Sequence, residues 1–144
     1  MANETMLKFG YPESLIREYE YWVVLLRPAQ VTLGSLVLAA KGEATAFGDL
    51  PTEAHAELSK IAKDIESVLK AAIGFQKINY LMLMMVDPHV HFHVLPRYEG
   101  SKPFNGADLR DAGWPGQPEL KSAATLPPTQ FEALRSRLSQ AWLA

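Results

Sequence analysis

The stretch Asp87–Tyr98, DPHVHFHVLPRY, contains three of the four histidines in the chain, each separated from the next by one apolar residue. These three are His89, His91 and His93. Successive side chains of a β-strand point to opposite faces, so the histidines are expected to share one face, with Val90 and Phe92 on the other. We therefore predict a strand with a row of imidazoles on one side and core residues on the other.

A row of imidazoles suits several kinds of chemistry. A neutral imidazole offers one hydrogen-bond donor and one acceptor, and it titrates near neutral pH. Such groups serve in proton transfer, nucleophilic attack, phosphate binding and metal ligation. Burying three of them as purely structural groups would require a hydrogen-bond partner for every ring nitrogen. The pattern therefore predicts a functional site on this strand.

The bulk composition indicates one domain and makes some partners poor candidates. A chain of 144 residues with 48% hydrophobic residues is long enough for one core, so we predict a single domain over residues 1–144. The formal net charge of -2 provides no broad positive field for a nucleic acid or an anionic membrane. The chain has no cysteine, and no run approaches the roughly 20 apolar residues of a membrane span. We expect a cytoplasmic protein.

Local patterns outline an α+β fold with an antiparallel sheet. The expected elements are a helical turn over 13–19, strands over 21–28, 34–41 and 77–86, and a long helix over 52–73. The run 77–86, KINYLMLMMV, is almost continuously apolar, which favours a central strand covered on both faces and joined to the histidine strand by a tight turn. Residues 99–127 are rich in glycine, proline and polar side chains and are predicted to be an irregular surface segment. A C-terminal helix over 128–143 follows, and the core spans about 13–98.

The histidine motif resembles the signature of one family. His-φ-His-φ-His-φ-φ, present here as HVHFHVL and followed by Pro96-Arg97, resembles the motif of the histidine triad (HIT) family of nucleotide hydrolases and nucleotidyl transferases. The resemblance extends from about Tyr21 to Tyr98. It implies a HIT-like fold, in which a long helix and a C-terminal helix pack on a five-stranded antiparallel sheet. It also implies a homodimer.

The resemblance assigns a role to each histidine. His91 would be the nucleophile that attacks the α-phosphorus of a nucleoside phosphate derivative and forms a covalent nucleotidyl-histidine. His93 would contact phosphate oxygens, and His89 would support the orientation of the site. A nucleotide is the expected small-molecule partner, with dinucleoside polyphosphates and nucleoside phosphoramidates as the substrate classes. No cofactor is implied.

Four other residues are candidate substrate contacts. Arg97 directly follows the motif and is suited to steer a phosphate, while Trp114 is suited to cover a purine ring. Asn79, within Lys77-Ile78-Asn79, and the later Trp114-Pro115 resemble a short-loop bacterial branch of the family. Ser35 follows a glycine at the place where relatives often have a further histidine.

The chain departs from the family pattern where many members have a polar, glycine-rich loop. That region reads MMVDP, so Met84 and Met85 replace side chains that donate hydrogen bonds. Two alternatives to an enzyme therefore stay open: a protein that binds nucleotides without turnover, and a metal site. Histidines two residues apart on a strand can share a metal ion, but Asp87 and Glu99 are the only nearby carboxylates.

Overall fold

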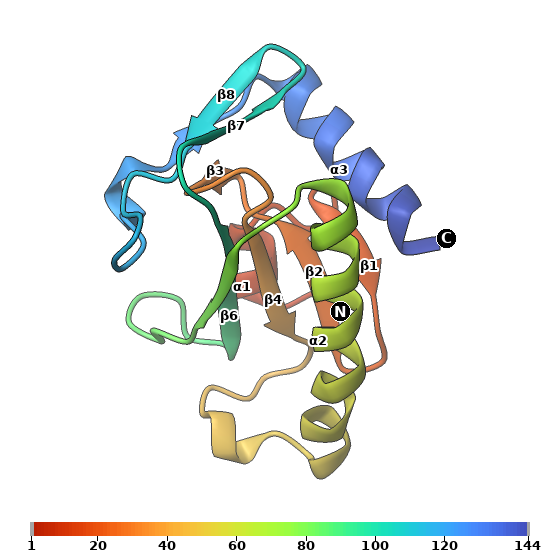
Figure 1. The fold of residues 1–144 in the computed structure, drawn as a ribbon. Coiled ribbons are helices and arrows are strands. Elements are labelled where there is room, and N and C mark those ends of the chain that lie inside the picture. Colours follow the sequence, from red (N-terminus) through yellow and green to blue (C-terminus); the bar gives the residue numbers. More distant parts are fainter. Residues whose placement is uncertain (1, 144) are drawn as a thin grey trace.

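The fold, described over residues 2–143 by a computed structural model, has the expected α+β class (Figure 1). In chain order its elements are α1 (Glu4–Lys8), β1 (Leu15–Glu18), β2 (Trp22–Leu26), β3 (Ala29–Gln30), β4 (Leu36–Ala40), η1 (Phe47–Asp49), α2 (Thr52–Ala72), β5 (Lys77–Leu81), β6 (His91–Arg97), β7 (Ser101–Phe104), β8 (Ala107–Arg110), η2 (Leu120–Ser122), β9 (Ala124–Thr125) and α3 (Pro128–Leu143). The main sheet has five antiparallel strands in the order β1-β2-β4-β6-β5. None of the helices within residues 2–143 is long and apolar enough to cross a membrane.

The main sheet is covered on both faces. On one face, α2 and α3 pack on the larger core cluster, to which Trp22 and Leu138 belong. On the other face, the short helix α1 brings Met6 and Phe9 onto a smaller cluster with β2 and β4. Figure 1 shows α1 and α2 on opposite sides of the sheet. An accessible polar site on the sheet therefore has to lie beyond the edge of one of these two hydrophobic clusters.

The pairing of β4 with β6 decides which face carries the histidines. His91 lies opposite Ala39, and His93 lies opposite Val37. Directly opposed residues of antiparallel strands point to the same face of the sheet. Since Val37 and Ala39 belong to the smaller cluster, both histidines face α1 rather than α2.

Helix α2 confirms the prediction to within one residue at its C-terminal end. Its apolar residues recur at helical spacing and face the sheet, and the buried ones are Ala54, Ile61, Ile65 and Leu69. Gly74 follows the helix with φ +75°, a left-handed conformation that glycine adopts without steric cost. The indole of Trp22 donates to the carbonyl of Ala54 at 2.8 Å and anchors the start of α2 to β2.

Two predicted elements are wrong. Residues 13–19 contain a strand, β1, rather than a helical turn, because Ile16 points into the core while the backbone pairs with β2. The strand predicted over 77–86 ends at Leu81 and lies at the edge of the sheet instead of its centre. Its continuation, 82–86, forms a loop. Met82 and Met84 pack against the larger core cluster, while Leu83, Met85 and Val86 lie on the side of His91 and His93.

The prediction of an irregular segment over 99–127 is also wrong in part. Strands β7 and β8 form a hairpin there, and Figure 1 shows it beyond the end of β6, near α3. Its turn is Asn105-Gly106, with φ values of +47° and +89°. This dipeptide is a strong hairpin signal, since both residues tolerate positive φ. A second short pair, β3 with β9, ties the segment to the residues that follow β2.

The N-terminal residues belong to the fold although the predicted core begins at about residue 13. Asn3 caps α1 by accepting a hydrogen bond from the backbone N–H of Met6 at 2.9 Å. Its amide also donates to the carbonyl oxygens of Ala40 and Gly42, at 3.0 and 2.8 Å. These contacts hold α1 against the end of β4, and thus beside the histidine strand.

Candidate active site

A cavity of about 280 Å³ opens on the histidine face of the sheet. Its walls come from the end of α1, the end of β2, the loop between β5 and β6, and β6 itself. The lining residues are Lys8, Phe9, Arg27, Leu83, Met84, Met85, Val86, Asp87, His91 and His93. The strand alternation and the docking of α1 thus place two of the three histidines at one cavity.

His91 is held in one orientation by its own strand. Only 2% of the residue is exposed, and Nδ1 lies 2.7 Å from the carbonyl oxygen of His89. A carbonyl oxygen only accepts hydrogen bonds, so Nδ1 carries the proton of the neutral ring and Nε2 carries the lone pair. Nε2 has no hydrogen-bond partner among residues 2–143. Every fully buried side-chain nitrogen or oxygen there has a partner, so Nε2 is accessible rather than fully buried. The Nε2 lone pair therefore faces the cavity.

His93 stands beside His91 with its ring at a steep angle. The ring centroids are 5.1 Å apart with an interplanar angle of 84°, and Phe9 contacts both rings at 5.6 Å. Burial, followed by the nearby Arg27 guanidinium and His91, lowers the pKa of His93 to about 4. The His93 ring is therefore neutral at pH 7.

Arg27 is a cavity residue that the sequence analysis missed. It directly follows β2, and its Nε donates a hydrogen bond to Nδ1 of His93 at 3.3 Å. Its Nη1 donates to the carbonyl of Ala29. Burial lowers the pKa of Arg27 from its usual value, but a guanidinium still keeps its charge at pH 7. The cavity therefore contains a fixed positive charge beside a neutral histidine.

His89 lies just before β6 and does not line the cavity. The hydroxyl oxygen of Thr5 accepts a hydrogen bond from the backbone N–H of His89, and it also contacts Nδ1, both at 3.1 Å. Nε2 lies 3.6 Å from a carboxylate oxygen of Glu43. These contacts fix the backbone of His89, whose carbonyl oxygen is the one that orients His91. Its predicted role of supporting orientation remains a prediction.

The loop between β5 and β6 forms one wall of the cavity with hydrophobic side chains. Met85 is 84% exposed, and Val86 is almost as exposed. Asp87 in the same loop makes an ion pair of 3.0 Å with Lys8 at the end of α1. The ion pair links α1 to the loop between β5 and β6. Lys8 and Arg27 carry two positive charges and Asp87 one negative charge, so the lining of the cavity has a net charge of one positive unit.

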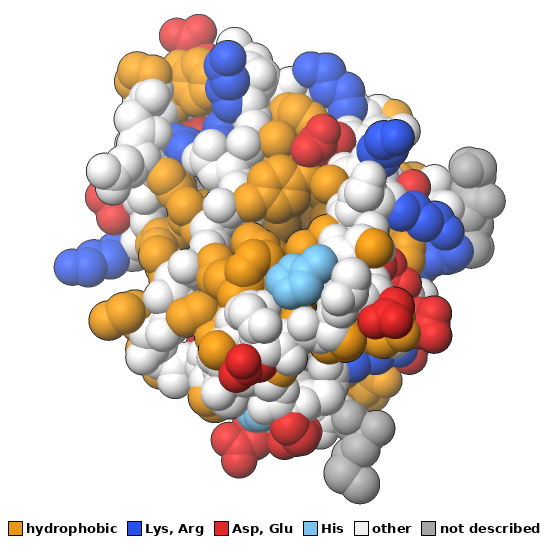
Figure 2. All heavy atoms as spheres, turned by 90° about the horizontal axis from the view of Figure 1, so that it is seen from below, with side chains coloured by type: hydrophobic (Ala, Val, Ile, Leu, Met, Phe, Trp, Pro, Cys, Tyr) orange, Lys and Arg blue, Asp and Glu red, His pale blue; other side chains and the backbone are white. Residues whose placement is uncertain are grey.

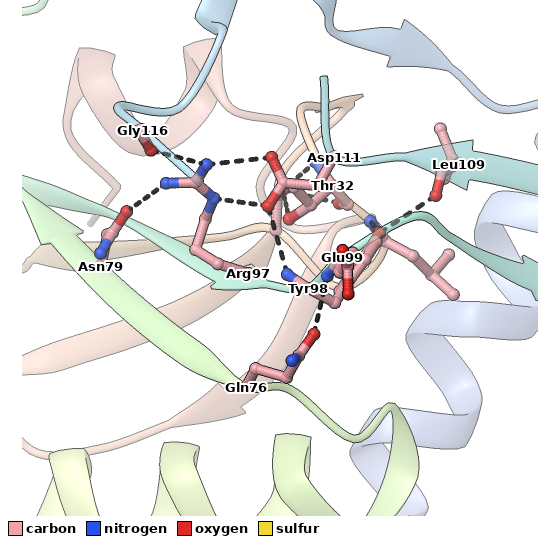
Figure 3. A network of polar contacts seen from close by, with 11 residues as sticks. Thr32, Gln76, Asn79, Arg97, Tyr98, Glu99, Leu109, Asp111 and Gly116 are labelled. Carbon is pink, nitrogen blue, oxygen red and sulfur yellow. Dashed lines mark hydrogen bonds and ion pairs between the residues drawn. The ribbon is translucent and has the colours of Figure 1, made fainter. Parts of the chain in front are cut away.

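Arg97 lies farther along the same strand, in a different environment (Figure 3). Its Nε and Nη2 donate to the two carboxylate oxygens of Asp111, at 2.7 and 3.0 Å. Nη1 donates to the side-chain oxygen of Asn79 at 2.7 Å, and Nη2 also donates to the carbonyl of Gly116 at 3.0 Å. This network, which we call the Arg97 network, ties the loop 111–116 to β5 and β6.

The structure separates the predicted substrate contacts from the histidines. Asn79, Arg97 and Trp114 line a second cavity of about 350 Å³, together with Lys77. Ser35 lines neither cavity: it is fully buried, and its hydroxyl donates to the carbonyl of Thr32 at 2.7 Å. The four residues are thus not brought to the cavity of His91 and His93.

The largest of the cavities described offers less for phosphate chemistry than the histidine cavity does. A larger cavity of about 460 Å³ lies between Pro28 and α3, but its charged lining residues are the carboxylates Glu13 and Glu132, which repel phosphate. Within residues 2–143, no group of three or more histidine, cysteine, aspartate or glutamate side chains is arranged to hold a metal ion. The histidine cavity is therefore the candidate active site.

Comparison with protein families agrees with the histidine motif. A family model for the HIT domain matches residues 11–100. The chain belongs to the HIT domain family. This family includes nucleotide hydrolases and nucleotidyl transferases. The match begins beyond α1 and ends before β7, so it leaves out Lys8 of α1 and the following Phe9, which line this HIT protein's cavity.

Solved structures share the fold of this HIT protein. A histidine triad protein from Marinobacter aquaeolei VT8 is 19% identical, with a TM-score of 0.77, over 99% of this chain and 96% of that one. A histidine triad (HIT) protein from Sinorhizobium meliloti 1021 is 21% identical, with a TM-score of 0.76, over 97% and 95%. The diadenosine triphosphate hydrolase of Plasmodium falciparum is 12% identical, with a TM-score of 0.64, over 90% and 76%. No curated protein matches the chain.

Proposed function

We propose that this HIT protein is a nucleotide hydrolase or nucleotidyl transferase that cleaves a nucleoside phosphate derivative at the α-phosphorus. The observation that carries the proposal is the state of His91. Its Nδ1–H is held by the carbonyl of His89, while the Nε2 lone pair faces a cavity with an excess of positive charge. A neutral imidazole with a free lone pair is a nucleophile at pH 7 without prior deprotonation.

The proposed reaction has two displacements at phosphorus. In the first, Nε2 of His91 attacks, and the leaving group departs with the electron pair of its bond to phosphorus. The ring is then positively charged, and the hydrogen bond from Nδ1 to the His89 carbonyl becomes stronger, which stabilises the intermediate. In the second, water attacks phosphorus, loses a proton to solvent and releases Nε2. Arg27 and Lys8 oppose the negative charge of the phosphate throughout.

Chemical trapping tests this proposal directly. The protein is mixed with dinucleoside polyphosphates, nucleoside phosphoramidates and sugar nucleotides that carry a label in the nucleotide, and the reaction is quenched early. We expect label on the protein that is lost in acid and kept in base, as for a phosphorus–nitrogen bond. Turnover without any labelled protein at early times would contradict the covalent route.

The place of the ligand supplies an independent test. We expect a nucleoside monophosphate to bind over His91, with its phosphate near His93. Chemical-shift changes on titration, or a crystal soaked with the ligand, measure this. Binding confined to the second cavity, around Trp114, would contradict the assignment of the histidine cavity.

Met85 supports a second candidate function, nucleotide binding without turnover. Its thioether stands at the mouth of the cavity and cannot donate the hydrogen bonds that stabilise a developing charge. A binding titration run beside turnover assays on the same substrates discriminates the two candidates. Tight binding with no product release on any substrate favours the binding protein.

We also propose that the protein is a homodimer. Hydrophobic side chains gather around a hollow on the face shown in Figure 2. The large hydrophobic residues that are exposed include Phe47, Leu83, Met85 and Val86. Exposed hydrophobic surface beyond scattered single residues marks interaction sites on globular proteins, and most soluble oligomers are symmetric. Light scattering over a range of concentrations tests the proposal, and a monomer at every concentration would remove it.

A further inference from the structure

We infer that Arg27 is a positioning residue that holds His93 in the tautomer with its proton on Nε2, so that His93 offers a hydrogen-bond donor beside the lone pair of His91. The consequence for catalysis rests on the proposed function. The tautomer itself does not, because it can be measured without turnover.

Hydrogen bonds hold both the backbone and the guanidinium of Arg27. Its backbone N–H donates to the carbonyl of Ser35 at 2.9 Å, and its own carbonyl accepts from the side chain of Gln30 at 2.6 Å. The guanidinium donates from Nη1 to Ala29 and from Nε to His93. A group held in this way has little freedom to turn away from the imidazole.

The hydrogen-bond chemistry of the two groups leaves one arrangement. A guanidinium has only donors, so Nδ1 of His93 must be the acceptor in this contact. A neutral imidazole with an accepting Nδ1 carries its proton on Nε2. The neighbouring His91 is the reverse case, because its Nδ1 faces a carbonyl oxygen and must donate. Two imidazoles 5.1 Å apart are therefore set in opposite tautomers.

The charges around His93 also keep the ring neutral. Arg27 faces it from the end of β2, His91 from β6 and Asp87 from the loop before β6, while Lys8 of α1 lines the same cavity. A second proton on Nδ1 would lie against the Arg27 guanidinium, which repels it. Asp87 has the opposite effect on His93, but it is paired with Lys8.

Opposite tautomers suit a displacement at phosphorus. His91 needs a lone pair to attack, and a neighbouring N–H can donate to a non-bridging phosphate oxygen as its charge develops. Without Arg27, His93 is free to place its proton on either nitrogen and to take up a second one. A misplacement of about 1 Å in a reacting group can cost on the order of 100-fold in rate, so we expect the loss of this contact to cost roughly 10- to 100-fold.

Histidine nitrogen shifts measured by NMR test the inference. In wild-type protein labelled with ¹⁵N-histidine, long-range imidazole spectra at pH 7 should show His93 protonated on Nε2 and His91 protonated on Nδ1. Arg27→Met should give His93 a mixture of tautomers and a higher pKa, whereas Arg27→Lys, which keeps a charged donor, should restore part of the wild-type pattern. Arg110→Met changes an exposed arginine on β8 and should leave the spectrum unchanged.

Each result supports or overturns the assignment. A wild-type His93 with its proton on Nδ1, or an Arg27→Met spectrum identical to wild type, overturns it. If Arg27→Met does not fold, the wild-type tautomers decide alone.

Kinetics extend the test where a substrate is turned over. Arg27→Met should lower kcat by roughly 10- to 100-fold and shift the acid limb of the pH profile to higher pH, with Arg27→Lys between it and wild type. An arginine that only stabilised the turn at residues 27–30 would leave the acid limb in place. A wild-type protein with the expected tautomers but no turnover contradicts the proposed function and leaves this inference standing.

Discussion

The two ends of β6 present polar residues on the same face of the sheet. They differ in how far protein partners use the hydrogen-bonding groups of those residues. His91 and Arg97 are about equally buried, at 2% and 3% exposure. One ring nitrogen of His91 is bonded and the other faces a cavity. The guanidinium of Arg97 makes four hydrogen bonds, two of them to the carboxylate of Asp111.

This difference distinguishes a buried polar group that stabilises the fold, as Arg97 does, from one that keeps an atom accessible at a cavity, as His91 does. A buried group must be hydrogen-bonded, so burial by itself says nothing about reactivity. What distinguishes the histidine end is hydrogen-bonding capacity that its protein partners do not use. The same alternation of side chains thus places two histidines at a cavity at one end of the strand and a hydrogen-bonded network at the other.

Replacing His91, the proposed nucleophile, should have the largest effect on activity. We expect His91→Asn to retain nucleotide binding and to lose turnover by on the order of a thousandfold or more, because the covalent route is removed. Steady-state kinetics and a binding titration measure the two effects. Normal turnover by this variant would falsify the mechanism, whatever the fold.

A substitution in the Arg97 network should lower the free energy of unfolding rather than the activity. Asp111→Asn removes the charge that neutralises a buried arginine, and such losses cost roughly 3–5 kcal/mol. Urea denaturation measures the free energy of unfolding, with Asp108→Asn on exposed β8 as the control. Turnover per folded molecule should stay near wild type. A stable variant with lost activity would show that the Arg97 network belongs to the active site.

Acid should destabilise the protein through His93. The folded-state pKa is about 4, below the ordinary value of 6.5. Between these pH values the unfolded chain binds a proton that the folded protein does not, so stability falls as the pH drops from 6.5 towards 4. His93→Gln removes this contribution. The loss of unfolding free energy between pH 7 and pH 4.5 should therefore be smaller in the variant by roughly 1–3 kcal/mol. Urea midpoints at pH 7 and pH 4.5 for both proteins give the difference, and parallel curves would count against it.

Removing the hydroxyl of Thr5 should have a smaller effect on both properties. Thr5→Val leaves the buried N–H of His89 without its acceptor, at a cost of about 1–2 kcal/mol. The His89 carbonyl then orients His91 less well, and we expect turnover to fall roughly tenfold. Thr45→Val, on an exposed loop, is the matched control for both assays. A variant with full activity would show that this support is dispensable.

The smallest change in stability is expected at the loop. Met85 is almost fully exposed, so Met85→Asn should change the free energy of unfolding by no more than about 0.5 kcal/mol. The amide adds a donor at the cavity mouth and should raise turnover or widen the range of substrates. Leu7→Asn introduces the same side chain in place of an exposed hydrophobic residue of α1, outside the cavity. An unchanged rate would show that position 85 does not reach the substrate.

Local sequence patterns determine several features of this protein, because these features depend only on residues that are close together in the chain. Alternation along a strand is enough to set His91 and His93 on one face, and helical spacing is enough to define α2. The hairpin turn Asn105-Gly106 is equally local, because this dipeptide is a hairpin signal even within a segment rich in glycine, proline and polar residues. In the same way, Asn3 followed by Met6 and Phe9 carried a usable signal for α1.

Only the tertiary structure decided which polar groups meet. The contact between Arg27 and His93 joins residues 66 positions apart, and that between Thr5 and His89 joins residues 84 positions apart. Such pairs depend on the order of strands in the sheet and on where α1 docks, and no local pattern encodes either. Arg97 shows the same limit, since its place after the motif suggested a phosphate ligand, while the fold gave it Asp111 as a partner. Local periodicity determined the faces of the elements, and long-range packing determined which side chains on those faces remain free to react.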